Sequence, residues 1–271
     1  MSLELMYITN NPKIALIAEK AGVNRIWIDL ETLGKEERQK GMNTVKSHHT
    51  IDDIKTISKL LTKSKMQVRI DPWNENSKKQ IEDVINAGAE LIMLPMWKKT
   101  EEVKCFINAV AGRTKTILLL ETKEAEECLD DVLKIKGIDE IHIGLNDLHL
   151  SYHLKFMFEL LSNGTVERIC NKIKKARIPY GIGGISHLGD GMLPADYIIM
   201  EHYRLGSTQA ILSRGFCDVS SGDMEIIESN FMLEMKKLRD YEETLKFKTN
   251  ADYQNNKNKV ADLVNKIVEA K

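Results

Sequence analysis

The chain has 271 residues and a formal net charge of −1, with 42% hydrophobic and 29% charged residues. This length is usual for one α/β barrel or for two small domains, and the composition is that of a globular protein with a substantial core. Because the charge is balanced, we expect neither nucleic acid nor a membrane surface as the main partner.

The cysteines and the hydropathy pattern indicate the compartment. Cys105, Cys128, Cys170 and Cys217 are scattered and form no CxxC or Cys/His pattern suited to zinc, so we expect reduced thiols. No apolar stretch approaches the ~20 residues that cross a bilayer, and no signal peptide opens the chain. We therefore expect a cytoplasmic protein.

In chain order, short apolar runs alternate with amphipathic stretches. Helices are predicted after Pro12, behind Thr50, and over residues 77–87, 101–111 and 125–135, three of them followed closely by glycine. Strands are predicted over residues 5–9, 25–29, 66–70, 91–94, 116–120, 140–143, 179–182 and 197–200.

Eight strands alternating with helices predict an α/β protein with a (β/α)₈ TIM barrel fold. An open doubly wound sheet is the alternative, but the first strand-to-helix turn, residues 9–12, lacks the glycines of a dinucleotide site. We place the barrel in residues 1–215. Residues 216–271 form a C-terminal helical extension, with helices over 224–243 and 256–271 separated by the hydrophilic segment 246–257. This extension belongs to the same domain or forms a subunit contact, so a homo-oligomer is expected.

Polar residues follow several predicted strands, at the barrel end where active sites lie. Asp29 and Glu31 follow the second strand, Arg69 ends the third, and Glu121 follows the fifth. Asp147 follows the sixth strand, and Glu201 and His202 follow the run predicted as the eighth. An acidic cluster with one arginine is therefore expected at one rim.

Glu121 and Asp147 are candidate metal ligands. Two oxygen donors, completed by substrate and water, suit Mg²⁺ or Mn²⁺. The alternative is that one carboxylate is an ion-pair partner or a helix cap. Arg69 lies in an apolar strand, where a guanidinium needs an anion. We expect it to stabilise a substrate oxyanion, or else to form a structural bridge to Asp29 or Glu31.

These pieces occur together in one known family. The chain resembles the HpcH/HpaI aldolase and citrate lyase β-subunit family of phosphoenolpyruvate/pyruvate-type barrels, over roughly residues 3–214. The resemblance is carried by Asp29-Leu30-Glu31, Val68-Arg69-Ile70, residues 88–95, Leu120-Glu121-Thr122 and residues 143–148.

The resemblance implies a metal-dependent carbon–carbon lyase. Glu121 and Asp147 would bind the metal, and Arg69 would bind the pyruvate-type oxygen and stabilise its enolate. The substrate would be a 2-oxo acid, or a related acyl compound such as a coenzyme A thioester, with the metal acting as a Lewis acid. The 2-oxo acid pocket would be lined by Pro95, Met96, Gly144, Leu145 and Asn146.

One departure concerns proton transfer. The aldolase branch carries histidine directly after the second strand's acidic residue, where this chain has Thr32. The segment 29–31 followed by residues 35–38 is closer to the citrate lyase branch, although Thr32 also replaces the second acid usual there. His48 and His49 are candidates to supply the base, or are simply an exposed loop pair.

Several weaker candidates remain on the predicted rim. His187 and His202 are further candidate rim residues, and Arg204 is either an anion-binding residue or part of a surface salt bridge. Residues 181–184 form a glycine-rich run that either cradles a phosphate or lets the backbone turn closely. Ser207 or Thr208 is expected to cap the last barrel helix.

Two alternatives to the lyase stay open. The first is a catalytically impaired barrel that binds metal and 2-oxo acid in a regulatory or structural role, as Thr32 suggests. The second is a metal-dependent phosphodiester hydrolase, which requires a third carboxylate on the metal. Glu31 and Glu201 are the candidates for that third ligand.

Overall fold

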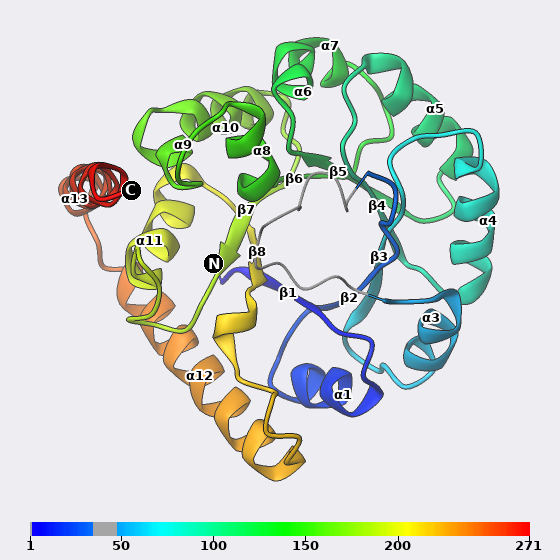
Figure 1. The fold of residues 1–271 in the computed structure, drawn as a ribbon, viewed down its shortest axis with the longest axis horizontal. Coiled ribbons are helices and arrows are strands. Elements are labelled where there is room, and N and C mark those ends of the chain that lie inside the picture. The colour runs from blue at the N-terminus through cyan, green and yellow to red at the C-terminus, as the bar shows by residue number, and fades with distance from the viewer. Residues whose placement is uncertain (1, 35–47) are drawn as a thin grey trace.

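A computed structural model describes residues 2–34 and 48–271, and its eight parallel strands close into a barrel in sequence order (Figure 1). The strands are β1 (Glu4–Ile8), β2 (Arg25–Asp29), β3 (Lys65–Arg69), β4 (Leu91–Leu94), β5 (Lys115–Leu120), β6 (Glu140–Ile143), β7 (Tyr180–Ile185) and β8 (Gln209–Leu212). The barrel closes where β1 pairs with β8, with Glu4 opposite Gln209. The predicted (β/α)₈ fold is confirmed, and the open sheet is excluded.

Helices surround the strands and connect them (Figure 1). Thr50 caps its helix as expected, because its side chain accepts a hydrogen bond from the Asp53 amide. The predicted helix over residues 125–135 is instead two short helices separated at Cys128. The helices are α1 (Pro12–Lys20), α3 (Ile51–Ser58), α4 (Ser77–Ala87), α5 (Thr100–Val110), α6 (Lys123–Glu127), α7 (Leu129–Val132), α8 (Leu145–Ser151), α9 (Glu159–Ser162), α10 (Thr165–Lys175), α11 (Ala195–Leu205), α12 (Met224–Leu245) and α13 (Asn250–Glu269).

The predicted eighth strand is wrong. Residues 197–200 lie inside α11, where Ile198, Ile199, His202 and Leu205 are buried at helical spacing. The true eighth strand is β8, which begins with the polar residue Gln209. Ser207 and Thr208 therefore connect α11 to β8 and cap no helix.

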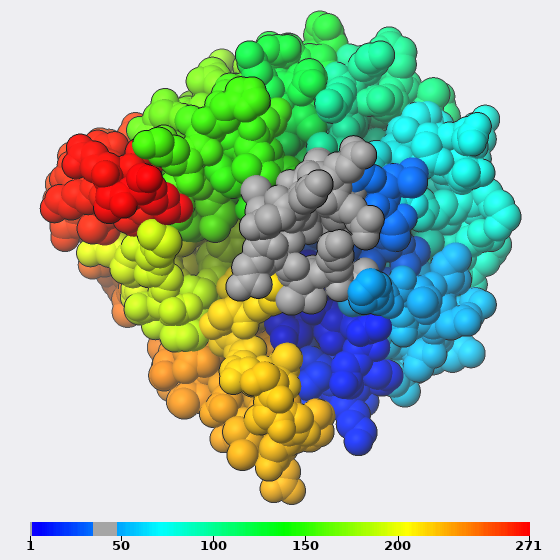
Figure 2. Space-filling view, in the orientation of Figure 1, coloured from blue at the N-terminus to red at the C-terminus, as the bar shows by residue number. Residues whose placement is uncertain are grey.

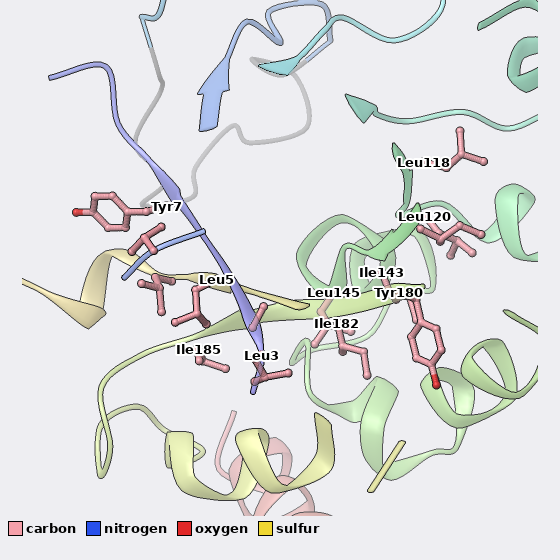
Figure 3. Packing of buried hydrophobic residues seen from close by; sticks show 14 of the residues in the cluster. Leu3, Leu5, Tyr7, Leu118, Leu120, Ile143, Leu145, Tyr180, Ile182 and Ile185 are labelled. Carbon is pink, nitrogen blue, oxygen red and sulfur yellow. The ribbon is translucent and has the colours of Figure 1, made fainter. Parts of the chain in front are cut away.

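Two apolar layers form the core. Residues such as Ile117 and Leu119 point into the barrel, whereas Leu118 and Leu120 point outward to the helices. Figure 3 shows the outer layer around Leu5, Ile143 and Ile182. Because side chains alternate along a strand, the inward row of each strand continues to the carboxyl-end rim.

The C-terminal helices extend the outer ring of helices. Helix α12 packs against α1, and α13 packs against α9 and α11. The second helix begins at Asn250, well inside the segment predicted as a spacer. No helix in the described ranges is long and apolar enough to cross a membrane.

Candidate functional site at the carboxyl-end rim

The rim gathers the acidic residues and the arginine that the sequence analysis selected. Asp29 is the last residue of β2, and Arg69 is the last residue of β3 and its register partner. Glu121 directly follows β5, and Asp147 lies in the first turn of α8, after β6. Strand alternation places these residues at one mouth, because their inward neighbours Trp27, Leu119 and His142 fill the barrel below.

Arg69 is held by two carboxylates. Its Nε and Nη2 donate to the two carboxylate oxygens of Asp29, each at 2.8 Å, and Nη2 lies 3.3 Å from Glu31 Oε2. The guanidinium also lies over the Trp27 ring, 5.3 Å from its centroid. Burial alone would lower the pKa of Arg69, but the charges of Asp29 and Glu31 outweigh it and raise that pKa. Arg69 therefore stays a fixed cation.

Glu121 and Asp147 form a strained electrostatic pair. Glu121 is only 3% exposed, and burial first, then the nearby charge of Asp147, raises its pKa well above the usual value. Its Oε1 accepts a hydrogen bond from the Met96 amide at 3.1 Å. Met96, which donates this hydrogen bond, has a left-handed backbone conformation with φ 53°. A Cβ on Gly144 would lie 2.9 Å from Glu121 Oε2, so this glycine makes room for the acid.

The donor set at this pair fits a hard divalent cation. Four carboxylates and one guanidinium lie together among the described rim residues, and two of those carboxylates are occupied with Arg69. A cation at Glu121 and Asp147 would relieve the repulsion that raises the pKa of Glu121. Mg²⁺ commonly binds through one or two carboxylates, with water and substrate filling the remaining positions.

The described part of the chain adds no third side-chain ligand to this pair. Within residues 2–34 and 48–271, no three His, Cys, Asp or Glu side chains are grouped to hold a metal ion. Glu31 is paired with Arg69, and Glu201 lies on α11, where it bonds Arg204 and Asn256. Neither of the two carboxylates expected as the third ligand of a phosphodiester hydrolase is therefore grouped with this pair.

The residues predicted to line the substrate pocket lie on both sides of Glu121. Pro95 and Met96 follow β4 on one side, and Gly144 starts α8 on the other. Leu145 is buried beside β7, where a Cβ on Gly183 would lie 2.8 Å from its Cδ1. Asn146 is exposed in the first turn of α8.

Only one of the candidate histidines is fixed at the rim. The backbone amide of Asp29 donates to His49 Nδ1 at 2.9 Å, whereas the neighbouring His48 is exposed. His187 lies partly exposed in the loop after β7, 3.8 Å from Asp190. His202 was wrongly placed on the rim, because it is buried in α11 and bonds Ser207.

Two other predicted groups have structural roles. Arg204 is paired with Glu201 and Glu167 and is not available to a substrate at the rim. A Cβ on Gly181 would lie 2.3 Å from His142 Nδ1, so the glycine-rich run allows close packing inside the barrel.

Thr32, which stands where the resemblance implies a histidine, is bound to Asp71. Asp71 Oδ1 accepts hydrogen bonds from the Thr32 amide at 2.7 Å, the Thr32 hydroxyl at 3.1 Å and the Leu33 amide at 3.0 Å. Gln80 on α4 fixes Asp71 in turn. Asp71 was not predicted as a site residue, although its position two residues after Arg69 was a signal. Residues 35–38, which suggested the citrate lyase branch, lie outside the described residues.

Fold and rim together define a (β/α)₈ barrel with an acidic site at its carboxyl end. The sequence profile of the HpcH/HpaI aldolase/citrate lyase family matches residues 4–176. The chain belongs to this family, which assigns it to the aldolase and citrate lyase type of lyase.

Solved structures show the same fold at low identity. An HpcH/HpaI aldolase from Desulfitobacterium hafniense DCB-2 superposes with a TM-score of 0.61 at 14% identity, covering 78% of this chain and 86% of the other. A family protein from Burkholderia cenocepacia J2315 gives 0.59 at 12% identity, covering 89% and 94%. The citrate synthase SbnG gives 0.60 at 16% identity, covering 79% and 87%. A search of curated protein sequences found no match.

Proposed function

We propose that the chain is a divalent-metal-dependent lyase that cleaves a carbon–carbon bond beside the carbonyl of a 2-oxo acid or related acyl substrate. The observation that supports this most directly is the buried Glu121 beside Asp147, facing the Arg69 cation. Two acids kept close in a buried site cost stability, and that cost is understandable where they bind a cation. Mg²⁺ or Mn²⁺ bound there would supply a Lewis acid that polarises the substrate carbonyl.

Arg69 supplies the fixed positive charge for the oxyanion that bond cleavage produces. Asp29 holds Nε and Nη2, so the guanidinium cannot rotate, and among the described residues Nη1 makes no hydrogen bond. That nitrogen is the donor we assign to the enolate oxygen. A donor that is already oriented stabilises developing charge without reorganising during the reaction.

The Met96 amide and Gly144 lie on opposite sides of the Glu121 carboxylate. The amide holds Oε1, and the absent side chain at Gly144 leaves space beside Oε2. Arg69 and the Glu121–Asp147 pair thus present a positive and a negative subsite at one mouth. This arrangement suits a substrate that carries an oxyanion and chelates a cation.

The residues available for proton transfer favour a second candidate function. In it, the barrel binds metal and 2-oxo acid but turns substrate over slowly. Thr32 is engaged with Asp71 and carries no basic group. His49 Nδ1 accepts a hydrogen bond from the Asp29 amide, so a neutral ring carries its proton on Nε2, which acts as a donor. Loss of a general base typically costs about 10²–10⁴ in rate.

The test is metal-dependent hydrogen–deuterium exchange at the methyl group of pyruvate, followed by NMR. Wild type is compared with Glu121→Ala/Asp147→Ala, and Glu101→Ala on the exposed face of α5 serves as the control. Exchange that needs Mg²⁺ or Mn²⁺ and vanishes only in the double variant supports enolate chemistry. Metal-dependent pyruvate binding without exchange supports the low-turnover barrel. If metal does not change pyruvate binding, the proposal that Glu121 and Asp147 are metal ligands is refuted.

A further inference from the structure

The two loops that carry Glu121 and Asp147 are joined to each other away from the site. Helix α6 begins two residues after Glu121, and its Lys123 amide donates to Ser151 Oγ at 2.8 Å. Ser151 is the last residue of α8, the short helix whose first turn contains Asp147. The start of one helix is therefore fixed to the end of the other.

A second contact joins the same helices. The hydroxyl of Tyr152, the C-cap residue of α8, donates to Glu126 Oε2 on α6. Glu126 is only 5% exposed, and Arg168 Nε on α10 donates to its Oε1 at 2.7 Å. Burial, followed by the bond to Glu126, raises the pKa of Tyr152 to about 12, so its hydroxyl keeps its proton near neutral pH.

The opposite side of Glu121 is also fixed. Thr122 Oγ1 donates to the Trp97 carbonyl at 2.9 Å, and the Met96 amide donates to Glu121 itself. The loop after β5 is thus tied to the loop after β4. It is tied to α8 at both ends of that helix: the Gly144 amide donates to the Leu120 carbonyl at 2.9 Å at the start, and Ser151 and the Tyr152–Glu126 contact hold the end.

We propose that Tyr152 and Glu126 are positioning residues that set the spacing between Glu121 and Asp147. The inference rests on the proposed metal site. Helix α8 has only seven residues, so a shift at its Tyr152 end displaces the turn that carries Asp147. Repulsion between the two acids in the absence of metal favours such a shift, and the Tyr152–Glu126 contact opposes it.

The chain contains a matched control for this contact. Tyr203 Oη donates to Glu242 Oε1 at 2.9 Å, and Glu242, which is 2% exposed, also bonds Arg239. This second Tyr–Glu–Arg group joins α11 to α12, remote in the fold from the loops after β5 and β6. Tyr152→Phe and Tyr203→Phe therefore remove the same hydroxyl group from a buried glutamate that is also bound to an arginine.

The experiment measures Mn²⁺ affinity and the electron paramagnetic resonance spectrum of bound Mn²⁺, together with Tm. Mutation of a group that orients a metal ligand typically lowers metal affinity by about 10–100-fold. We therefore expect Tyr152→Phe to weaken Mn²⁺ binding on the order of tenfold and to alter the Mn²⁺ spectrum. Tyr203→Phe should lower Tm and leave both metal readouts at their wild-type values.

Each outcome bears on a different part of the proposal. If wild type binds Mn²⁺ and Tyr152→Phe gives the same affinity and spectrum, the contact is only structural and this inference is overturned. Equal metal effects from both variants would also overturn it, because they would report general loosening. If wild type binds no Mn²⁺, the proposed metal site itself fails, and the positioning role fails with it.

Discussion

Replacing Arg69 with methionine tests whether the rim depends on this one cation. Asp29 and Glu31 are each 3% exposed, and the substitution removes two 2.8 Å hydrogen bonds from Asp29 and the ion pair from Glu31. Removing one partner of a buried ion pair typically costs about 3–5 kcal/mol, because the remaining charge stays buried. For a chain of this size that corresponds to a fall in Tm of roughly 6–20 °C.

Urea unfolding at pH 7 measures this cost. Arg113→Met is the control, since Arg113 forms a similar two-point pair with Glu82 on the exposed surface, where ion pairs contribute little. Adding Asp29→Asn to Arg69→Met should restore part of the lost free energy of unfolding by removing one buried charge. If Arg69→Met destabilises the chain no more than Arg113→Met does, the assignment of a buried, carboxylate-bound cation is incorrect.

Three further predictions concern separate groups. Gly144→Ala should weaken Mn²⁺ binding, as read by calorimetric titration, because the new Cβ would lie 2.9 Å from Glu121 Oε2 and 3.0 Å from Glu121 Cβ. Unchanged binding would contradict this close approach. His142 and His202 have pKa values lowered to about 4 and about 3, mainly by burial, whereas the unfolded chain titrates near 6.5. The unfolded state therefore binds more protons than the folded state below that pH. The free energy of unfolding, measured with urea, should fall as the pH drops from 6.5 towards 4. It should fall less steeply in His202→Gln. Nitrogen-15 NMR of His49 should show an unprotonated Nδ1 and a protonated Nε2 at neutral pH; the reverse tautomer would rule out the hydrogen bond from the β2 amide.

Periodicity predicted seven of the eight strands and failed where its signal was ambiguous. Residues 197–200 read as a buried strand because four adjacent residues are bulky and mostly apolar. In the fold they lie on a helix that is buried on one broad face. Strand β8 was missed because it starts with the polar residue Gln209, whose Nε2 donates to Glu140 inside the barrel. That partner is 69 residues away and leaves no local trace in the sequence.

The positions of the rim residues were predicted, whereas their hydrogen-bond partners were not. Asp29, Arg69, Glu121 and the turn containing Asp147 could be placed because strand ends in a parallel barrel meet at one rim. What pattern reasoning could not supply was the set of partners, such as Asp71, which binds residues 32 and 33 across a long sequence separation. Hydrogen bonds of this kind depend on loop geometry, which alternation of apolar residues does not determine.

The pairing of β1 with β8 has a consequence for how the chain reaches its folded state. The first strand can complete its hydrogen bonding only after residues 209–212 are available, more than 200 positions later. At ribosomal rates of about 5–20 residues per second, the nascent β1 waits for roughly 10–40 s with one edge unpaired. Folding of the closed barrel should therefore be slow and late, with exposed strand edges in the interim. Chains truncated before β8 should aggregate rather than form a partial barrel.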